Sequence, residues 1–360
     1  MTDIGDDIKS AVSAGIVTEA QAASLLAHVQ SRQGQRDHMA ADDEPFEFFR
    51  GFAEIFVTVG LSLLLGGLFG VAWFVTSALM AGVILAGVSA YLARYYTLKR
   101  RMTLPSMMLS VAAIGGAMVA VFAALDTGLT ISKSTYLSTF AAGAVISVVY
   151  FAIYRLPFAM FLFGINVLGV VYATAANVTT LYAAAQNPSQ SLFDLGTGSH
   201  LAAASLIYGF GLMALGLWFD MRDPHRISRY SATGFWLHIL AAPALVNTGA
   251  MSLYNLGGTM GYLSTAALLI TVTLFALIVD RRSFLTAGVF YFIAIISWAA
   301  NETMGATTGT ASVIFIIGAF FTAIGTWWIQ IRARIMQALP EFPGKDRLPP
   351  YHINNRGLND

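Results

Sequence analysis

The sequence predicts an all-α polytopic membrane protein, and three features of its composition carry that prediction. Of the 360 residues, 57% are hydrophobic and only 11% are charged, and the mean hydropathy is +0.68. An average globular domain has about 25% charged residues, so this chain has too few to cover a soluble protein's surface. Twenty Lys and Arg against nineteen Asp and Glu leave no basic excess for phosphates, which excludes a nucleic-acid partner.

Residues 1–33 are predicted to form a cytoplasmic helical hairpin. Apolar residues recur at helical spacing up to Gly15, and Thr18-Glu-Ala-Gln21 has the form of a capping box that opens a second helix. The two helices either cover each other or lie near the membrane, or they form a docking module for a cytoplasmic protein partner. No basic start followed by an apolar stretch is present, so we expect no signal peptide.

Residues 34–50 are predicted to be a linker followed by an interfacial aromatic segment. The run 34–45 has no periodicity. Phenylalanines and Arg50 then form an aromatic–basic stretch that is typical of the lipid headgroup level.

Ten apolar runs are predicted to cross the bilayer within a transmembrane domain at 51–334. Each is long enough for about 30 Å of hydrocarbon. A single helix over 55–92 would be about 57 Å long, which favours two spans separated at Thr76-Ser77 over a nine-span alternative. The ten runs are 55–75, 78–96, 105–125, 137–154, 158–176, 201–219, 232–248, 262–279, 284–300 and 311–331.

The basic residues of the short loops predict the orientation. With the N-terminus in the cytoplasm, the inner loops hold twelve cations and the outer loops hold Lys133 alone. This asymmetry follows the positive-inside rule and places both termini in the cytoplasm.

The tail at 335–360 is rich in Pro, Asn and charge, so we expect it to be irregular and mobile.

The spans repeat a two-helix hairpin. Phe219-Asp-Met-Arg222 closes the sixth span and Val279-Asp-Arg-Arg282 closes the eighth. Because two spans return the chain to the same side, the copies share one orientation and the repeats are parallel. A Gly precedes an Asn by thirteen residues in three odd spans, and Ala113 precedes Asp126 by the same offset: Gly164 and Asn177, Gly234 and Asn247, Gly288 and Asn301.

Two interpretations fit this repeated polar position. Asn tolerates the left-handed conformation and can cap a helix C-terminus. Alternatively, the four side chains form an outer polar ring around a vestibule. The four residues are Asp126, Asn177, Asn247 and Asn301.

Three polar residues of the spans are candidates for a membrane site. His238, five residues before Pro243, can bind a ligand or carry a proton, or it bonds a neighbouring helix. Asn166 is expected to hold two helices together. Glu54 is a candidate proton site that we expect to be solvated at the inner interface.

The Gly-Gly pairs at 66–67 and 115–116, with Gly82 and Gly87, are expected to allow close helix packing.

No catalytic, cofactor or metal site is predicted. The chain has no Cys, and it has no Walker-type phosphate loop, no HExxH zinc helix and no G-x-S-x-G nucleophile turn. We therefore expect a non-enzymatic membrane scaffold or sensor that acts through its N-terminal hairpin. The alternative is a facilitator that moves a small neutral or amphipathic solute along the repeat axis.

The hairpin sequence Ala14-Gly-Ile-Val-Thr-Glu-Ala-Gln21, the polar linker, the short-looped spans and the tail Arg347-Leu-Pro-Pro350 resemble a known family. These are bacterial inner-membrane proteins of the "domain of unknown function 2157" type. The resemblance implies a bacterial inner-membrane location. It implies no activity and no functional residues.

Overall fold

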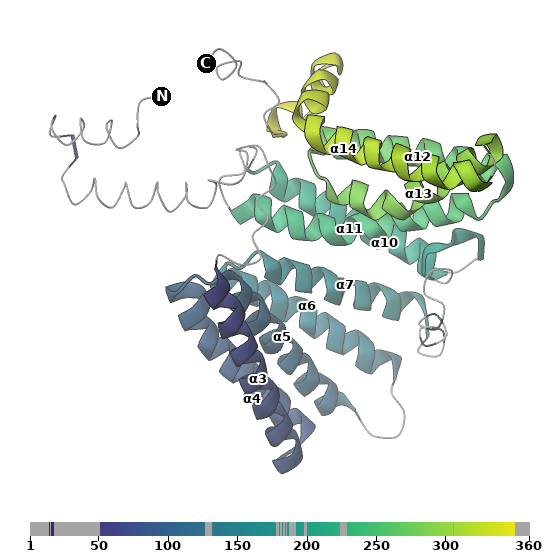
Figure 1. Cartoon of the computed structure of the whole chain (residues 1–360). Helices are drawn as coiled ribbons and strands as arrows, with labels where there is room; N and C mark the ends of the chain where they lie inside the picture. Colours follow the sequence, from purple (N-terminus) through teal and green to yellow (C-terminus); the bar gives the residue numbers. More distant parts are fainter. Residues whose placement is uncertain are drawn as a thin grey trace. The chain divides into compact units, whose positions relative to one another are not determined.

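The computed structural model describes residues 14, 16–17, 51–126, 132–177, 180, 182, 184, 186, 192–197, 200–223, 229–304 and 306–349. The chain divides into two units, 1–45 and 46–360, and almost all of the described residues belong to the second. The predicted hairpin at 1–33 and the linker at 34–50 therefore lie outside the described residues, apart from three positions. Every regular element in the described part is helical, which confirms the predicted all-α class (Figure 1).

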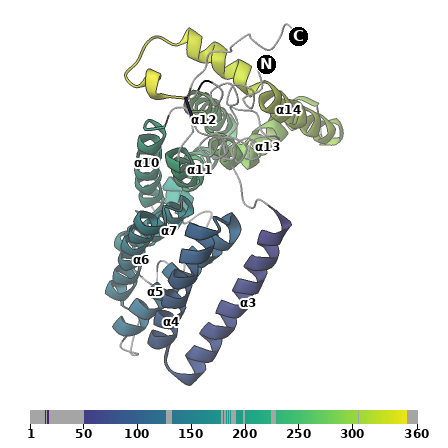
Figure 2. The same cartoon turned by 90° about the vertical axis from the view of Figure 1, so that its left-hand side faces the viewer.

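The second unit is a series of long helices joined mostly by short connections (Figures 1 and 2). A π-helical turn η1 follows α4, and two 3-10 turns are η2 (Leu195–Thr197) and η3 (Lys345–Arg347). The helices are α3 (Phe52–Val75), α4 (Ala78–Ala93) with η1 (Arg94–Lys99), α5 (Thr103–Leu125), α6 (Lys133–Tyr154), α7 (Phe158–Ala175), α10 (His200–Asp220), α11 (Arg229–Tyr254), α12 (Gly258–Val279), α13 (Ser283–Met304) and α14 (Ala306–Ala338).

Nine helices of the described part are long and apolar enough to cross a membrane, so the protein is a multi-pass membrane protein. The ninth predicted run falls on α13, which has 22 residues and is about 33 Å long; several of its side chains lie outside the described residues. The alternative of one helix over 55–92 is wrong. Thr76 leaves the helical conformation (φ −121°, ψ −100°), and the Ser77 hydroxyl caps α4 by accepting from the Met80 amide at 3.3 Å.

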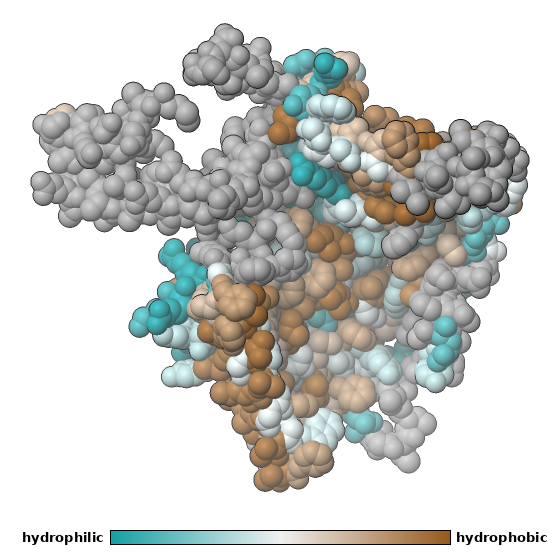
Figure 3. Space-filling view, viewed as in Figure 1, coloured by the Kyte–Doolittle hydropathy of each residue, from teal (hydrophilic) through white to brown (hydrophobic). Residues whose placement is uncertain are grey.

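Consecutive helices pack side by side. α3, α4 and α5 contact one another, α6 lies between α5 and α7, and α7 contacts both α10 and α11. α12 and α13 then pack on α11, and α14 packs on α12 and α13. Apolar side chains cover the exposed sides of α3 and α4 along most of their length, where a bilayer would contact them (Figure 3).

The bundle has two chemically different ends. We call the end at which α4, α6, α10, α12 and α14 finish the basic end. There, the Tyr154 hydroxyl donates to the Ala90 carbonyl at 2.6 Å, and Arg229 Nη1 donates to the Arg155 carbonyl at 3.2 Å. At the opposite end, Lys133 Nζ donates to the Thr174 carbonyl at 3.0 Å.

The C-terminal part differs from the prediction. α14 continues beyond 331 to Ala338, with a break at Trp327 (φ −106°, ψ 20°). The 21 residues before the break are about 31 Å long, which matches the hydrocarbon thickness. Residues 339–349 are irregular apart from the turn η3, and they pack on the basic end: Lys345 and Leu348 are buried, and Arg332 Nη2 donates to the Pro349 carbonyl at 2.6 Å. Residues 350–360 lie outside the described part.

Candidate functional site

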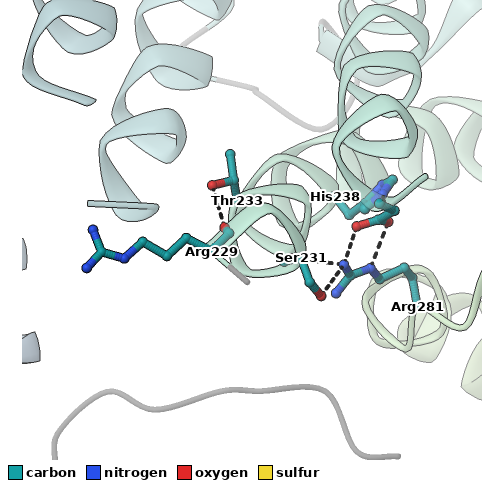
Figure 4. A network of polar contacts seen from close by, with 6 residues as sticks. Arg229, Ser231, Thr233, His238 and Arg281 are labelled. Carbon is teal, nitrogen blue, oxygen red and sulfur yellow. Dashed lines mark hydrogen bonds and ion pairs between the residues drawn. The ribbon is translucent and has the colours of Figure 1, made fainter. Parts of the chain in front are cut away.

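Charged side chains are buried at the basic end of the C-terminal helices. Asp220 is the last residue of α10, His238 lies in α11, and Arg281 follows the end of α12. Their exposed fractions are 5%, 0% and 0%. We call these three residues, together with Ser231 of α11, the Asp220 network (Figure 4).

The Asp220 carboxylate binds Arg281 and His238, and Ser231 joins the network through Arg281. Arg281 Nη2 donates to Asp220 Oδ1, and Arg281 Nε donates to Oδ2 at 3.1 Å, so the guanidinium binds the carboxylate through two hydrogen bonds. Arg281 Nη2 also donates to the Ser231 carbonyl at 2.9 Å. His238 Nε2 lies 3.0 Å from Asp220 Oδ2. The network therefore ties α10, α11 and the connection between α12 and α13 together.

The position of Asp220 is unfavourable without these partners. The carbonyl end of a helix carries partial negative charge, so an acid there is repelled by the helix dipole. A buried carboxylate also loses its hydration, which costs several kcal/mol unless an opposite charge and hydrogen bonds offset it. Arg281 supplies both.

Two glycines make room for the network. A Cβ on Gly216 of α10 would lie 2.8 Å from His238 Cε1, and a Cβ on Gly234 of α11 would collide with Asp220 Oδ1. Any larger residue at either position would displace the imidazole or the carboxylate. In the sequence, Gly234 is the Gly that precedes Asn247 by thirteen residues in the predicted repeat. In the structure, Gly234 contacts Asp220.

A second network continues from the first. Asp280 ends α12 in the left-handed conformation (φ 61°), and its Oδ1 accepts from the Trp328 indole at 2.6 Å. Arg332 Nε lies 3.8 Å from the same oxygen, and Arg332 also binds the Pro349 carbonyl. Because Asp280 and Arg281 are adjacent, polar contacts run from α10 through α12 and α14 to the C-terminal segment.

The structure brings one of the three sequence candidates into the network. His238 bonds a neighbouring helix, α10, through Asp220. Asn166 is buried, but its Nδ2 donates to the Leu162 carbonyl of its own helix at 2.8 Å, and its Oδ1 faces Gly143 of α6. The expected link between helices is therefore a packing contact at Asn166.

The burial of Glu54 differs from the prediction that this side chain is solvated. The side chain is 5% exposed and not solvated. Its Oε2 accepts from the backbone amides of Thr103 and Leu104, each at 3.1 Å. The first amides of a helix have no intrahelical acceptor, and Glu54 supplies one for α5 from another helix.

The four residues of the predicted outer ring do not occupy equivalent positions. Asp126 and Asn177 follow the ends of α5 and α7, but Asn247 and Asn301 lie inside α11 and α13. The cap interpretation is wrong for the latter two. Asp126 does occupy the C-cap of α5, but its backbone is extended (φ −76°, ψ 116°) and not left-handed. α11 continues past Asn247 because Thr248 and Ala250 are fully buried, which a loop would not achieve.

A hollow of about 330 Å³ lies at the opposite end of the bundle, between the start of α6, the end of α7 and the start of α10. Its polar lining comes from Lys133, Asn177, Thr180 and His200. Of the predicted ring, Asn177 alone is among the residues that line it.

The chemistry that the Asp220 network supports is helix linkage and proton exchange. A carboxylate and an imidazole within hydrogen-bond distance can share a proton, and the guanidinium keeps the pair electrically balanced. Among the described residues, no group of three His, Cys, Asp or Glu side chains is placed to hold a metal ion.

The burial of Asp220, Asp280 and Arg281 was not predicted from the sequence. Their segments were expected to be similar span ends, with Arg281 among the cations of the inner loops. The available signal was an acid in the last turn of an apolar helix, repeated at both span ends, where a helix dipole disfavours it.

Comparison of the chain with family models, with curated protein sequences and with solved structures found no match. The resemblance to the inner-membrane family therefore stays a prediction.

Proposed function

We propose that the protein is a scaffold or sensor of the bacterial inner membrane whose N-terminal segment 1–33 binds a cytoplasmic protein partner. Both termini are then cytoplasmic, and the basic end faces the cytoplasm. The observation that carries the proposal is the Glu54 contact, because it connects the start of the first described helix to the bundle.

Glu54 connects the first turn of α3 to the start of α5. It lies in the first turn of α3, three residues after the described bundle begins at Gly51. Its carboxylate holds the first two amides of α5, and its carbonyl accepts from the Thr58 hydroxyl at 2.7 Å. α5 in turn contacts α3, α4, α6 and α7. In the proposal, a displacement at residue 51 would act through Glu54 on α5, which contacts four other helices.

The Asp220 network also supports a scaffold or sensor. Its ionisable side chains bind one another and join helices. A network of this kind holds a fixed arrangement, or it favours one of two arrangements in a switching protein.

The experiment compares the full chain in detergent with a chain that lacks residues 1–33. We expect the full chain to capture a cytoplasmic protein that the shortened chain does not. Equal capture by both chains would contradict the proposal.

A second measurement tests the coupling through Glu54. A fluorophore on Arg101→Cys, at the exposed connection before α5, should report binding of the captured partner. Glu54→Gln removes the charge and should reduce that signal while capture is retained. An unchanged signal in Glu54→Gln would exclude Glu54 as the coupling group.

A facilitator of a small neutral or amphipathic solute is the second candidate function, and the hollow beside Lys133 and His200 favours it. Purified protein in liposomes should then increase solute flux, and Lys133→Gln with His200→Gln should lower it. No flux, together with capture that requires residues 1–33, would favour the scaffold or sensor.

A further inference from the structure

Four cations cluster at the connection between α4 and α5. Arg94, Lys99, Arg100 and Arg101 lie within eight residues, and all four are exposed. We call them the 94–101 patch. The patch directly follows an apolar span, so in a bilayer it lies at the level of the lipid headgroups.

The backbone holds the patch in a defined shape. α4 ends in the π-helical turn η1, where the Arg100 amide donates to the Tyr95 carbonyl at 2.8 Å, and Arg101 then takes a left-handed conformation (φ 54°). Arg100 Nε donates to the Tyr95 hydroxyl at 2.9 Å. Lys99 Nζ lies 5.9 Å from the centre of the same ring. Tyr95 therefore positions two of the four cations.

The bond with Tyr95 leaves the outer nitrogens of Arg100 for a ligand. This hydrogen bond raises the pKa of the Arg100 guanidinium above its usual value, so the group stays charged. A guanidinium in a fixed position can bind a phosphate through two parallel hydrogen bonds.

Within the described part of the chain, no carboxylate lies at ion-pair distance from the patch. Glu54, which binds the first amides of α5 two and three residues after the patch, is buried and engaged by those amides. Two cations of the C-terminal helices differ, because Arg281 and Arg332 are buried beside Asp220 and Asp280. The positive charge of the patch is thus left for a partner outside the described residues.

Exposed apolar side chains on the same turns indicate what kind of partner fits. Tyr91 is 71% exposed and Leu98 is 48% exposed, one on each side of Tyr95 in the sequence. A phospholipid presents a phosphate with attached acyl chains, so it can meet the cations and the apolar side chains together. Free phosphate would meet the cations alone.

We propose that the 94–101 patch binds the headgroup of an anionic phospholipid. Lys99 and Arg100 contact the phosphate, and Tyr91 and Leu98 contact the acyl region. The site is separate from the Asp220 network and does not depend on the function proposed above.

The test uses the full chain in mixed phosphatidylglycerol and phosphatidylcholine, with bound lipid counted by native mass spectrometry. Each Lys or Arg of a juxtamembrane polybasic segment contributes about 1 kcal/mol toward an anionic lipid, which is about five-fold in relative affinity. Lys99→Gln with Arg100→Gln should lower the preference for phosphatidylglycerol about thirty-fold. Higher ionic strength should lower the wild-type preference as well, which checks the site without any substitution.

Arg334→Gln with Arg347→Gln is the matched control. It removes the same charge from exposed positions at the basic end and should leave the preference within about two-fold. An equal loss in the control would mean that total charge, not the patch, selects the lipid. An unchanged preference in the Lys99 and Arg100 variant would overturn the proposal. Displacement of bound lipid by inorganic phosphate would overturn the assignment to a phospholipid.

Discussion

At the scale of single residues, the hydrogen bond between His238 and Asp220 predicts how substitutions of His238 change the stability of the protein. His238→Gln keeps a donor at similar reach and should leave the thermal stability nearly unchanged. His238→Leu removes the bond and should cost about 0.6–2 kcal/mol, the range for polar contacts between helices in bilayers. Thermal unfolding in detergent measures both.

The same substitutions test whether His238 titrates in the working protein. An imidazole that changes its charge does so between about pH 5 and 8. A conformational signal in that range that disappears in His238→Gln, with stability unchanged, would contradict a purely structural role.

Among the charged residues, removal of the Arg281 charge should lower the stability of the protein most. Arg281→Met leaves the Asp220 carboxylate buried without its counter-charge, and we expect a loss of about 3–5 kcal/mol in the free energy of unfolding. Asp220→Asn combined with Arg281→Met removes both charges and should restore most of that loss. Arg334→Met, at an exposed position, is the control and should change stability by less than about 0.5 kcal/mol. A double variant as unstable as Arg281→Met would show that charge pairing is not the cause.

At the scale of helices, the structure separates glycines that the sequence could not distinguish. Gly82 of α4 and Gly116 of α5 face each other: a Cβ on Gly82 would lie 2.6 Å from the Gly116 carbonyl oxygen and from the Ala120 amide nitrogen. A Cβ on Gly87, Gly66 or Gly67 would meet nothing within 4 Å. The expectation of close packing therefore holds at Gly82 and Gly116.

Gly82→Ala and Gly87→Ala are consequently a matched pair. Gly82→Ala forces the backbones of α4 and α5 apart and should cost about 1–3 kcal/mol. Gly87→Ala fills open space and improves helix propensity, so stability should rise by up to about 1 kcal/mol. Chemical denaturation in detergent compares the two, and equal effects would argue against the α4–α5 contact.

Hydropathy predicted the helix boundaries well where a span is followed by polar residues. α3 and α6 end at Thr76 and Arg155, within one residue of the ends of the predicted spans. The two helices that extend furthest beyond their predicted spans, α11 and α14, continue through residues that packing buries, such as Ala250 and Met336. Hydropathy alone does not predict which residues tertiary packing buries, so it does not predict these longer helices.

At the scale of the molecule, the predicted orientation can be tested directly, because the chain contains no Cys. Single Cys residues at Ser134 and Leu256, exposed at the opposite end, should react with an impermeant thiol reagent added outside intact cells. Cys at Met221 and Glu341, exposed at the basic end, should react only after permeabilisation. Thr248, the residue beside Asn247, is no suitable probe because it is fully buried in α11. The reverse labelling pattern would invert the orientation.

The sequence by itself determined the all-α class and the order of the spans, because these depend on local hydropathy and on the length of each run. The tertiary structure alone decided which charges are buried. Asp220 meets Arg281 across sixty-one residues, and Asp280 meets Arg332 across fifty-two. Glu54 meets the start of α5 across forty-nine. Helical periodicity fixes which face of a helix a residue occupies, but its partner on another helix is set by how the helices pack.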